Sequence, residues 1–145
     1  MRSSASVQIK PLENIFISRY LMSRMRTHVV ESLPEEACGL LVCSADGRAI
    51  RHFPIENNLH NATRYRMNPV QQLKVLLWME KEHLDHLVIY HSHPDGPDHL
   101  SENDINQSFY PDAVYLLWYH RKKRWFAKTY RINSGLSHEI RLFIK

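Results

Sequence analysis

The chain has 145 residues, which is long enough for one domain with a single hydrophobic core. Hydrophobic residues make up 43% and charged residues 23% of the chain, fractions that exclude a disordered or fibrous protein. Lys and Arg outnumber Asp and Glu by 19 to 15, for a formal net charge of +4, but the basic residues are scattered apart from residues 121–124. The charge leaves open an acidic partner or nucleic acid, although the scatter of the basic residues favours neither.

No apolar run approaches the length of a membrane span, and residues 1–10 lack the hydrophobic region of a signal peptide. The two cysteines, Cys38 and Cys43, are five positions apart in one predicted strand and therefore face opposite sides of it. Two thiols placed in this way do not pair readily in a disulfide. These features favour a reduced, cytoplasmic protein.

The N-terminal residues 1–14 contain several serines and a proline and are predicted to form a flexible segment, with the domain itself spanning residues 15–145. Residues 15–17 predict a short strand, and Ser18 is a typical helix cap. A helix is expected from there to Ser32, because apolar residues recur at four-residue spacing.

A hairpin is predicted next, with strands at residues 37–43 and 48–55 joined by an Asp-Gly turn. The following residues 57–66 are polar and irregular, and a short strand is expected at 65–67. Asn68 followed by proline is the capping signal of a second helix. Its buried stripe is predicted to consist of Val70, Leu73, Leu76, Leu77 and Leu84.

In the second half of the chain, residues 86–91 carry apolar side chains on both faces, which is typical of a central strand covered on both sides. A short helix is predicted to begin at Ser101 and to bury Ile105 and Phe109. Three more strands are expected at 113–119, 125–132 and 138–144, with the basic residues 121–124 at a hairpin tip. This order predicts an α/β domain with a mixed sheet flanked by helices.

The end of the central strand carries a candidate metal site. His91 and His93 project to the same side, because successive strand side chains alternate between faces. Asp104, in the first turn of the next helix, can bring a carboxylate to the same point. Two imidazoles and a carboxylate leave a fourth position open for water, as in catalytic zinc sites. Alternatively, Ser101 and Asp104 form only a helix cap with an acid in the first turn.

The full pattern, His-x-His-Pro-x6-Ser-x2-Asp, resembles the JAMM motif of the MPN+ (JAB) metallopeptidases. The segment from Pro34 to Leu41 resembles the upstream Pro-x-Glu-x-Cys-Gly-Leu-Leu pattern of the same family and places Glu36 at the family's glutamate. The resemblance covers about residues 15–142. It implies a single MPN/JAB domain of the cytidine-deaminase-like fold.

The resemblance also implies roles for the site residues. His91, His93 and Asp104 would bind zinc, although iron, cobalt or manganese suit the same ligands. Glu36 would be the general base that accepts a proton from water and passes it to the leaving amine. Ser101 would stabilise the oxyanion of the tetrahedral intermediate. The implied reaction is hydrolysis of an amide or isopeptide bond after the C-terminal glycine of a ubiquitin-like protein.

The compact length of the chain bears on the substrate. Hardly any room lies between Asp104 and Ala113 for the insertions with which eukaryotic deubiquitinases grip a second ubiquitin. In this the chain resembles stand-alone prokaryotic members, which implies that its partner is a sulfur-carrier protein with a Gly-Gly C-terminus. Such an extended tail can bind by β-augmentation. Residues 57–67 are either one wall of its groove or an ordinary connecting loop.

Two other functions fit parts of the pattern. A non-catalytic MPN scaffold is one, although such domains typically lack the ligands that this chain retains. A RadC-like, DNA-associated JAB protein is the other, since that branch carries a related His-x-His-Pro motif. The segment 34–41 is closer to the peptidase branch, so neither nucleic acid nor a membrane is the expected partner.

Overall fold

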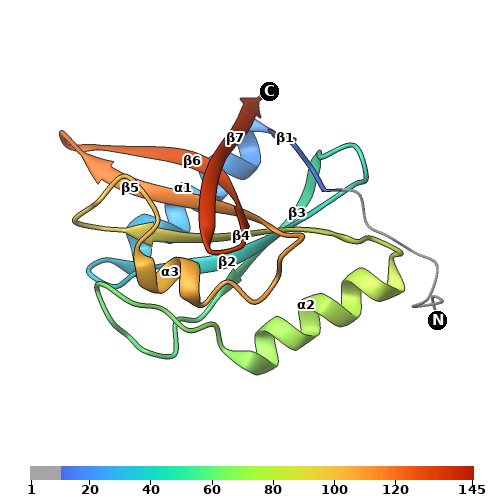
Figure 1. Cartoon of the computed structure of the whole chain (residues 1–145). Coiled ribbons are helices and arrows are strands. Elements are labelled where there is room, and N and C mark those ends of the chain that lie inside the picture. The colour runs from blue at the N-terminus through green and yellow to red at the C-terminus, as the bar shows by residue number, and fades with distance from the viewer. Residues whose placement is uncertain (1–10) are drawn as a thin grey trace.

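The computed structural model describes residues 11–145, and these form a seven-stranded mixed sheet with three helices (Figure 1). The strands are β1 (Asn14–Ile17), β2 (Cys38–Cys43), β3 (Ala49–Ile55), β4 (His86–His93), β5 (Val114–Arg121), β6 (Arg124–Asn133) and β7 (Leu136–Ile144). The helices are α1 (Arg19–Ser32), α2 (Pro69–Lys81) and α3 (Glu102–Asn106). The predicted fold class is confirmed. Of the predicted flexible segment, residues 1–10 lie outside the described part of the chain.

The strand order is β1-β7-β6-β5-β4-β2-β3, which places β4 inside the sheet between β5 and β2. The pairs β1 with β7 and β4 with β5 are parallel, and the other neighbouring strands are antiparallel. All eight residues of β4 are buried. The prediction of a central strand covered on both sides is therefore confirmed.

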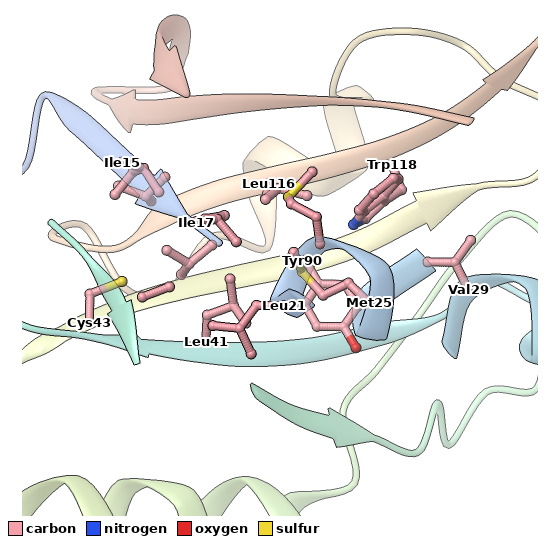
Figure 2. Packing of buried hydrophobic residues seen from close by; sticks show 14 of the residues in the cluster. Ile15, Ile17, Leu21, Met25, Val29, Leu41, Cys43, Tyr90, Leu116 and Trp118 are labelled. Carbon is pink, nitrogen blue, oxygen red and sulfur yellow. The ribbon is translucent and has the colours of Figure 1, made fainter. Parts of the chain in front are cut away.

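The two faces of the sheet carry separate cores. Val88 and Tyr90 of β4 pack on the face that α1 covers, and Leu87 and Ile89 pack on the face that α2 and α3 cover. Figure 2 shows the core beneath α1, labelled at Ile15, Ile17, Leu21, Met25, Val29, Leu41, Cys43, Tyr90, Leu116 and Trp118. β4 is therefore packed against a hydrophobic core on each of its two faces.

The two cysteines follow the same division. Cys38 lies in the core beneath α2, Cys43 lies in the core beneath α1, and both thiols are free and buried. The predicted opposite orientation is confirmed. Burial raises the pKa of each thiol to about 12, so neither is a thiolate near neutral pH.

The helix starts agree with the sequence signals. The Ser18 hydroxyl accepts a hydrogen bond from the Leu21 amide at 3.1 Å and caps α1. The Asn68 side chain accepts from the amides of Val70 and Gln71 and caps α2. No helix among residues 11–145 is long and apolar enough to cross a membrane.

The predicted buried stripe of α2 is wrong. Val70, Leu73 and Leu77 are 61%, 54% and 57% exposed, whereas Val75 and Met79 are the residues that α2 buries. Of the remaining two predicted residues, Leu76 is partly buried, and Leu84 is partly buried but lies beyond the end of α2 at Lys81. Because α2 is apolar on two sides, periodicity alone did not identify which side meets the sheet.

Two smaller predictions also fail. Phe109 is 75% exposed, because α3 ends at Asn106 and Phe109 lies beyond the face that buries part of Ile105. The expected strand at residues 65–67 is reduced to an isolated bridge between Asn57 and Met67. The backbone of this segment is instead organised by side-chain hydrogen bonds, which matter at the site below.

Candidate metal centre

Three donor atoms converge at the end of β4. The Nε2 atoms of His91 and His93 lie 3.2 Å apart, and each lies 3.1 Å from Oδ2 of Asp104. Both imidazoles are buried, and the Asp104 side chain is almost completely covered. The structure thus brings together the three residues that the sequence singled out as metal ligands.

A capping box holds the carboxylate in place. The Ser101 hydroxyl accepts a hydrogen bond from the Asp104 amide at 3.0 Å, and Asp104 Oδ2 accepts one from the Ser101 amide at 2.8 Å. The oxygen that caps the helix is the same oxygen that faces the two imidazoles. The two interpretations of Ser101 and Asp104, as a cap and as part of a site, are therefore compatible.

The turn after β4 orients His93. Nδ1 of His93 lies 2.8 Å from the Pro97 carbonyl oxygen and, as the only possible donor of the pair, donates to it. Nε2 of a neutral His93 then carries its lone pair toward Asp104, and two acceptors face each other. A cation between them resolves this conflict, so the donor set fits a metal ion, and two imidazoles with a carboxylate suit zinc.

Without a cation, protons are shared within the cluster. Burial would raise the pKa of Asp104, but hydrogen bonds with His91 and His93 hold it well below its usual range. Burial lowers the pKa of His91 against the opposing effect of Asp104. For His93 burial also acts downward, but Asp104 and the Pro97 carbonyl together raise the pKa. Of the two imidazoles, His93 is therefore the one whose protonated form its surroundings favour.

Glu36 supplies a second carboxyl beside this cluster. It is only 2% exposed, and its Oε1 has no hydrogen-bond partner among residues 11–145. Burial raises its pKa to about 8; the charge of His93 opposes the shift and that of Asp104 adds to it. A bound cation would lower this pKa again, since a nearby positive charge favours the carboxylate.

The backbone around Glu36 is fixed from two directions. Its amide donates to the Asn61 carbonyl at 2.8 Å, and its own carbonyl accepts from the Asn57 side-chain amide at 3.0 Å. The next amide, that of Ala37, donates to the Ser92 hydroxyl at 2.8 Å, between the two histidines of β4. These contacts join the base candidate directly to the strand that carries the metal ligands.

Three residues at the site escaped the sequence analysis. They are Tyr65, whose ring stacks on His91, together with Asn57 and Ser92, which hold the backbone near Glu36. A single aromatic residue within a polar segment was the only available signal for Tyr65. A partly open pocket of about 290 Å³ extends from Asp104 between Tyr65, Tyr115 and the start of α2.

The remaining histidines lie elsewhere. His99 is exposed in the turn, as expected. His28 and His52 meet at the Tyr90 hydroxyl on the opposite face of the sheet. Within the described residues, His91, His93 and Asp104 are the only group of metal-ligating side chains with converging donor atoms.

Comparison with known proteins identifies the family. The sequence model of the family described as prokaryotic homologs of the JAB domain matches residues 18–132. The chain therefore belongs to this family. A match of this extent includes α1, the hairpin, α2, the candidate metal centre and most of the C-terminal strands.

Individual relatives agree with that assignment. The CysO-cysteine peptidase of Mycobacterium tuberculosis is 36% identical over 117 residues, which cover 79% of this chain and 80% of that protein. The probable TtuB-protein conjugate cleaving protease of Thermus thermophilus is 33% identical over 96 residues, 65% of this chain and 63% of that protein. The solution structure of protein DSY2949 from Desulfitobacterium hafniense has a TM-score of 0.79 at 28% identity, covering 90% of this chain and 92% of that one.

Proposed function

We propose that the protein is a zinc-dependent hydrolase that cleaves the amide bond after the C-terminal glycine of a ubiquitin-like or sulfur-carrier protein adduct. The observation that carries the proposal is the convergence of His91, His93 and Asp104 beside the buried carboxyl of Glu36. Perturbed carboxyl groups beside a metal-ligating cluster are typical of hydrolytic active sites.

His91, His93 and Asp104 would hold the metal with two nitrogens and one oxygen. Zinc held there supplies a Lewis acid that polarises the scissile carbonyl and lowers the pKa of a water toward neutrality. The capping box and the Pro97 carbonyl keep Asp104 and His93 oriented, so little reorganisation is needed when the metal binds.

Glu36 is the proposed general base. Its carboxylate accepts a proton from the attacking water and passes it to the amine that leaves. Its position, buried beside the cluster with one oxygen free of partners in the described part of the chain, suits a group that exchanges protons with a substrate.

Ser101 is the proposed oxyanion donor. Its oxygen accepts a hydrogen bond from the Asp104 amide, which leaves its hydroxyl proton free to point elsewhere. Donated to the carbonyl oxygen of the substrate, this proton stabilises the negative charge that develops there.

The substrate class is inferred from the relatives and from the shape of the chain. Two relatives are named for cleaving a CysO-cysteine adduct and TtuB-protein conjugates. Only residues 107–113 separate α3 from β5, which supports a compact enzyme without the insertions used for a second ubiquitin. Since β4 and β2 are each paired on both sides, a tail that adds a strand needs a free edge, and the candidates are β3 at the end of the sheet and the irregular 57–67 segment.

The two alternative functions receive less support. A non-catalytic scaffold does not account for a complete donor cluster next to a buried carboxyl. A DNA-associated role has in its favour only the basic net charge and the basic run at residues 121–124, where β5 turns into β6. The two free, buried cysteines support the reduced cytoplasm as the proposed compartment.

The substrate proposal is tested with a purified carrier whose C-terminal Gly-Gly is linked to a single amino acid. The zinc-loaded protein should release the amino acid, because glycine passes a narrow groove without a side chain to clash. Replacing the last glycine of the carrier with leucine should suppress cleavage at least about tenfold. Mass spectrometry of the carrier measures both reactions, and equal rates would contradict the proposed selectivity.

A further inference from the structure

The two histidines of the metal centre are held by different means. His93 has its remote nitrogen Nδ1 bonded to the Pro97 carbonyl. Nδ1 of His91 is buried and has no hydrogen-bond partner among residues 11–145. Histidines that bind metals almost always donate the remote N–H to a partner, because that bond fixes the ring orientation. Some other contact must therefore fix the orientation of the His91 ring.

Tyr65 provides a contact of the right kind. Its ring is stacked on the His91 imidazole, with ring centroids 4.7 Å apart and planes inclined by 23°. This geometry restricts rotation of the imidazole about its Cβ–Cγ bond, since rotation drives one ring into the other. No hydrogen bond joins the Tyr65 hydroxyl to another described residue, so the contact depends on the ring.

Tyr65 is itself held firmly. The Asn57 side chain donates from Nδ2 to the Arg64 carbonyl and accepts at Oδ1 from the Arg66 amide, at 3.0 and 3.1 Å. Both neighbours of Tyr65 are thus tied to one buried amide group. The same Nδ2 also donates to the Glu36 carbonyl at 3.0 Å. The segment that presents Tyr65 to His91 therefore also fixes the backbone of the proposed base.

From these contacts we infer that Tyr65 is a positioning residue for the metal centre. Its ring takes the place of a hydrogen bond to Nδ1 and keeps Nε2 of His91 aimed at the point shared with His93 and Asp104. The inference rests on the metal site of the proposed function. It predicts that the aromatic ring, and not the hydroxyl, contributes to metal affinity.

The test measures zinc affinity by competition with a chromophoric chelator for the wild type, Tyr65→Phe and Tyr65→Leu. Tyr65→Leu should bind zinc about 10- to 100-fold more weakly, the usual effect of removing an orienting partner. Tyr65→Phe should stay within about threefold of the wild type, because it keeps the stack. Phe143→Leu is a matched control, since it removes the stacked pair with Phe16 on β1 and β7 and should leave zinc affinity unchanged.

Thermal melting of the metal-free proteins separates misfolding from lost positioning. If Tyr65→Leu does not fold, Tyr65→Met replaces it, because its flexible side chain fills the space without a ring. Wild-type affinity in a folded variant without the ring would overturn the inference, and so would a Tyr65→Phe protein as weak as Tyr65→Leu. A wild type that binds no zinc would instead overturn the metal site. A wild type that binds zinc without cleaving conjugates would refute only the proposed activity.

Discussion

The Tyr90 hydroxyl links two histidines on the face of β4 that points away from the metal ligands. His28 of α1 and His52 of β3 approach it at 2.6 and 2.7 Å. One hydroxyl proton cannot serve both nitrogens, so one imidazole accepts the proton and the other donates its own N–H. Beneath this group, a Cβ at Gly39 would come within 2.3 Å of the Tyr90 ring, which explains the glycine in β2.

This arrangement predicts a pH dependence of stability. Burial lowers the pKa of His52 from 6.5 to about 4, and the charges of His28 and Arg24 add to the effect. The pKa of His52 in the folded protein lies below its value in the unfolded chain. The contribution of neutral His52 to the free energy of unfolding is therefore complete above about pH 6.5 and is lost as the pH falls through about 4. His52→Gln cannot gain the charge and should lose less stability on acidification.

Urea unfolding of the metal-free wild type and His52→Gln between about pH 7 and pH 4 measures the effect. The difference in free energy of unfolding between the two proteins should change by about 1–2 kcal/mol over this pH range. This figure allows for the partial exposure of His52, since solvent screens its charge. Parallel pH profiles for the two proteins would show that His52 is not buried in its neutral form.

At the scale of single elements, α3 joins a structural and a chemical role in one turn of helix. Asp104 Oδ2 accepts the Ser101 amide and also faces both imidazoles. A five-residue helix has little intrinsic stability, so its position depends on this cap and on the packing of Ile105 and Leu100. The cap therefore fixes the position of Asp104, the third proposed metal ligand.

Ser101→Ala tests the two roles of the hydroxyl separately. Loss of the cap should cost about 1 kcal/mol of stability, seen as a modest fall in the melting temperature. Loss of an oxyanion donor should reduce turnover about 100- to 1,000-fold. Kinetics and melting curves are recorded on the same preparation. A variant that is less stable but almost fully active would leave Ser101 with the cap role alone.

The helix α2 shows where sequence patterns stop being informative. Its start followed from the Asn68-Pro69 signal, but its buried face is set by Val75 and Met79, which belong to the core beneath it. Leucines on the other side satisfied the same periodicity and remain exposed. The local pattern specifies that a helix forms, whereas tertiary contacts decide which of two apolar faces is buried.

For the whole molecule, residues 11–145 follow the predicted order of strands and helices apart from the expected strand at 65–67, because turn and cap signals are local. The side-by-side placement of His91 and His93 was also predictable, since it depends only on the alternation of side chains along a strand. Asn57 and Tyr65 were not, because their roles depend on contacts with Glu36 and His91, each more than 20 positions away. Such contacts have no local signature.

The assembled site depends on the sheet as a whole. Register between β2 and β4 pairs Cys38 with His91 and so brings Glu36, which precedes β2, to the end of β4. The short connection after β4 returns Asp104 to the same place. The proposed base Glu36 and the proposed ligand Asp104 are nearly 70 positions apart in the sequence. The site therefore forms only when the chain is folded.

The central claim is that Glu36 acts as the base at a zinc held by His91, His93 and Asp104. The most direct measurement compares turnover of a Gly-Gly carrier conjugate by the wild type and by Glu36→Gln, with zinc content determined on both. Glutamine keeps the shape of the side chain but cannot accept the proton, so we expect about one zinc per chain in each protein. Turnover should fall about 100- to 10,000-fold in the variant. A zinc-loaded Glu36→Gln protein that cleaves at the wild-type rate would contradict the account.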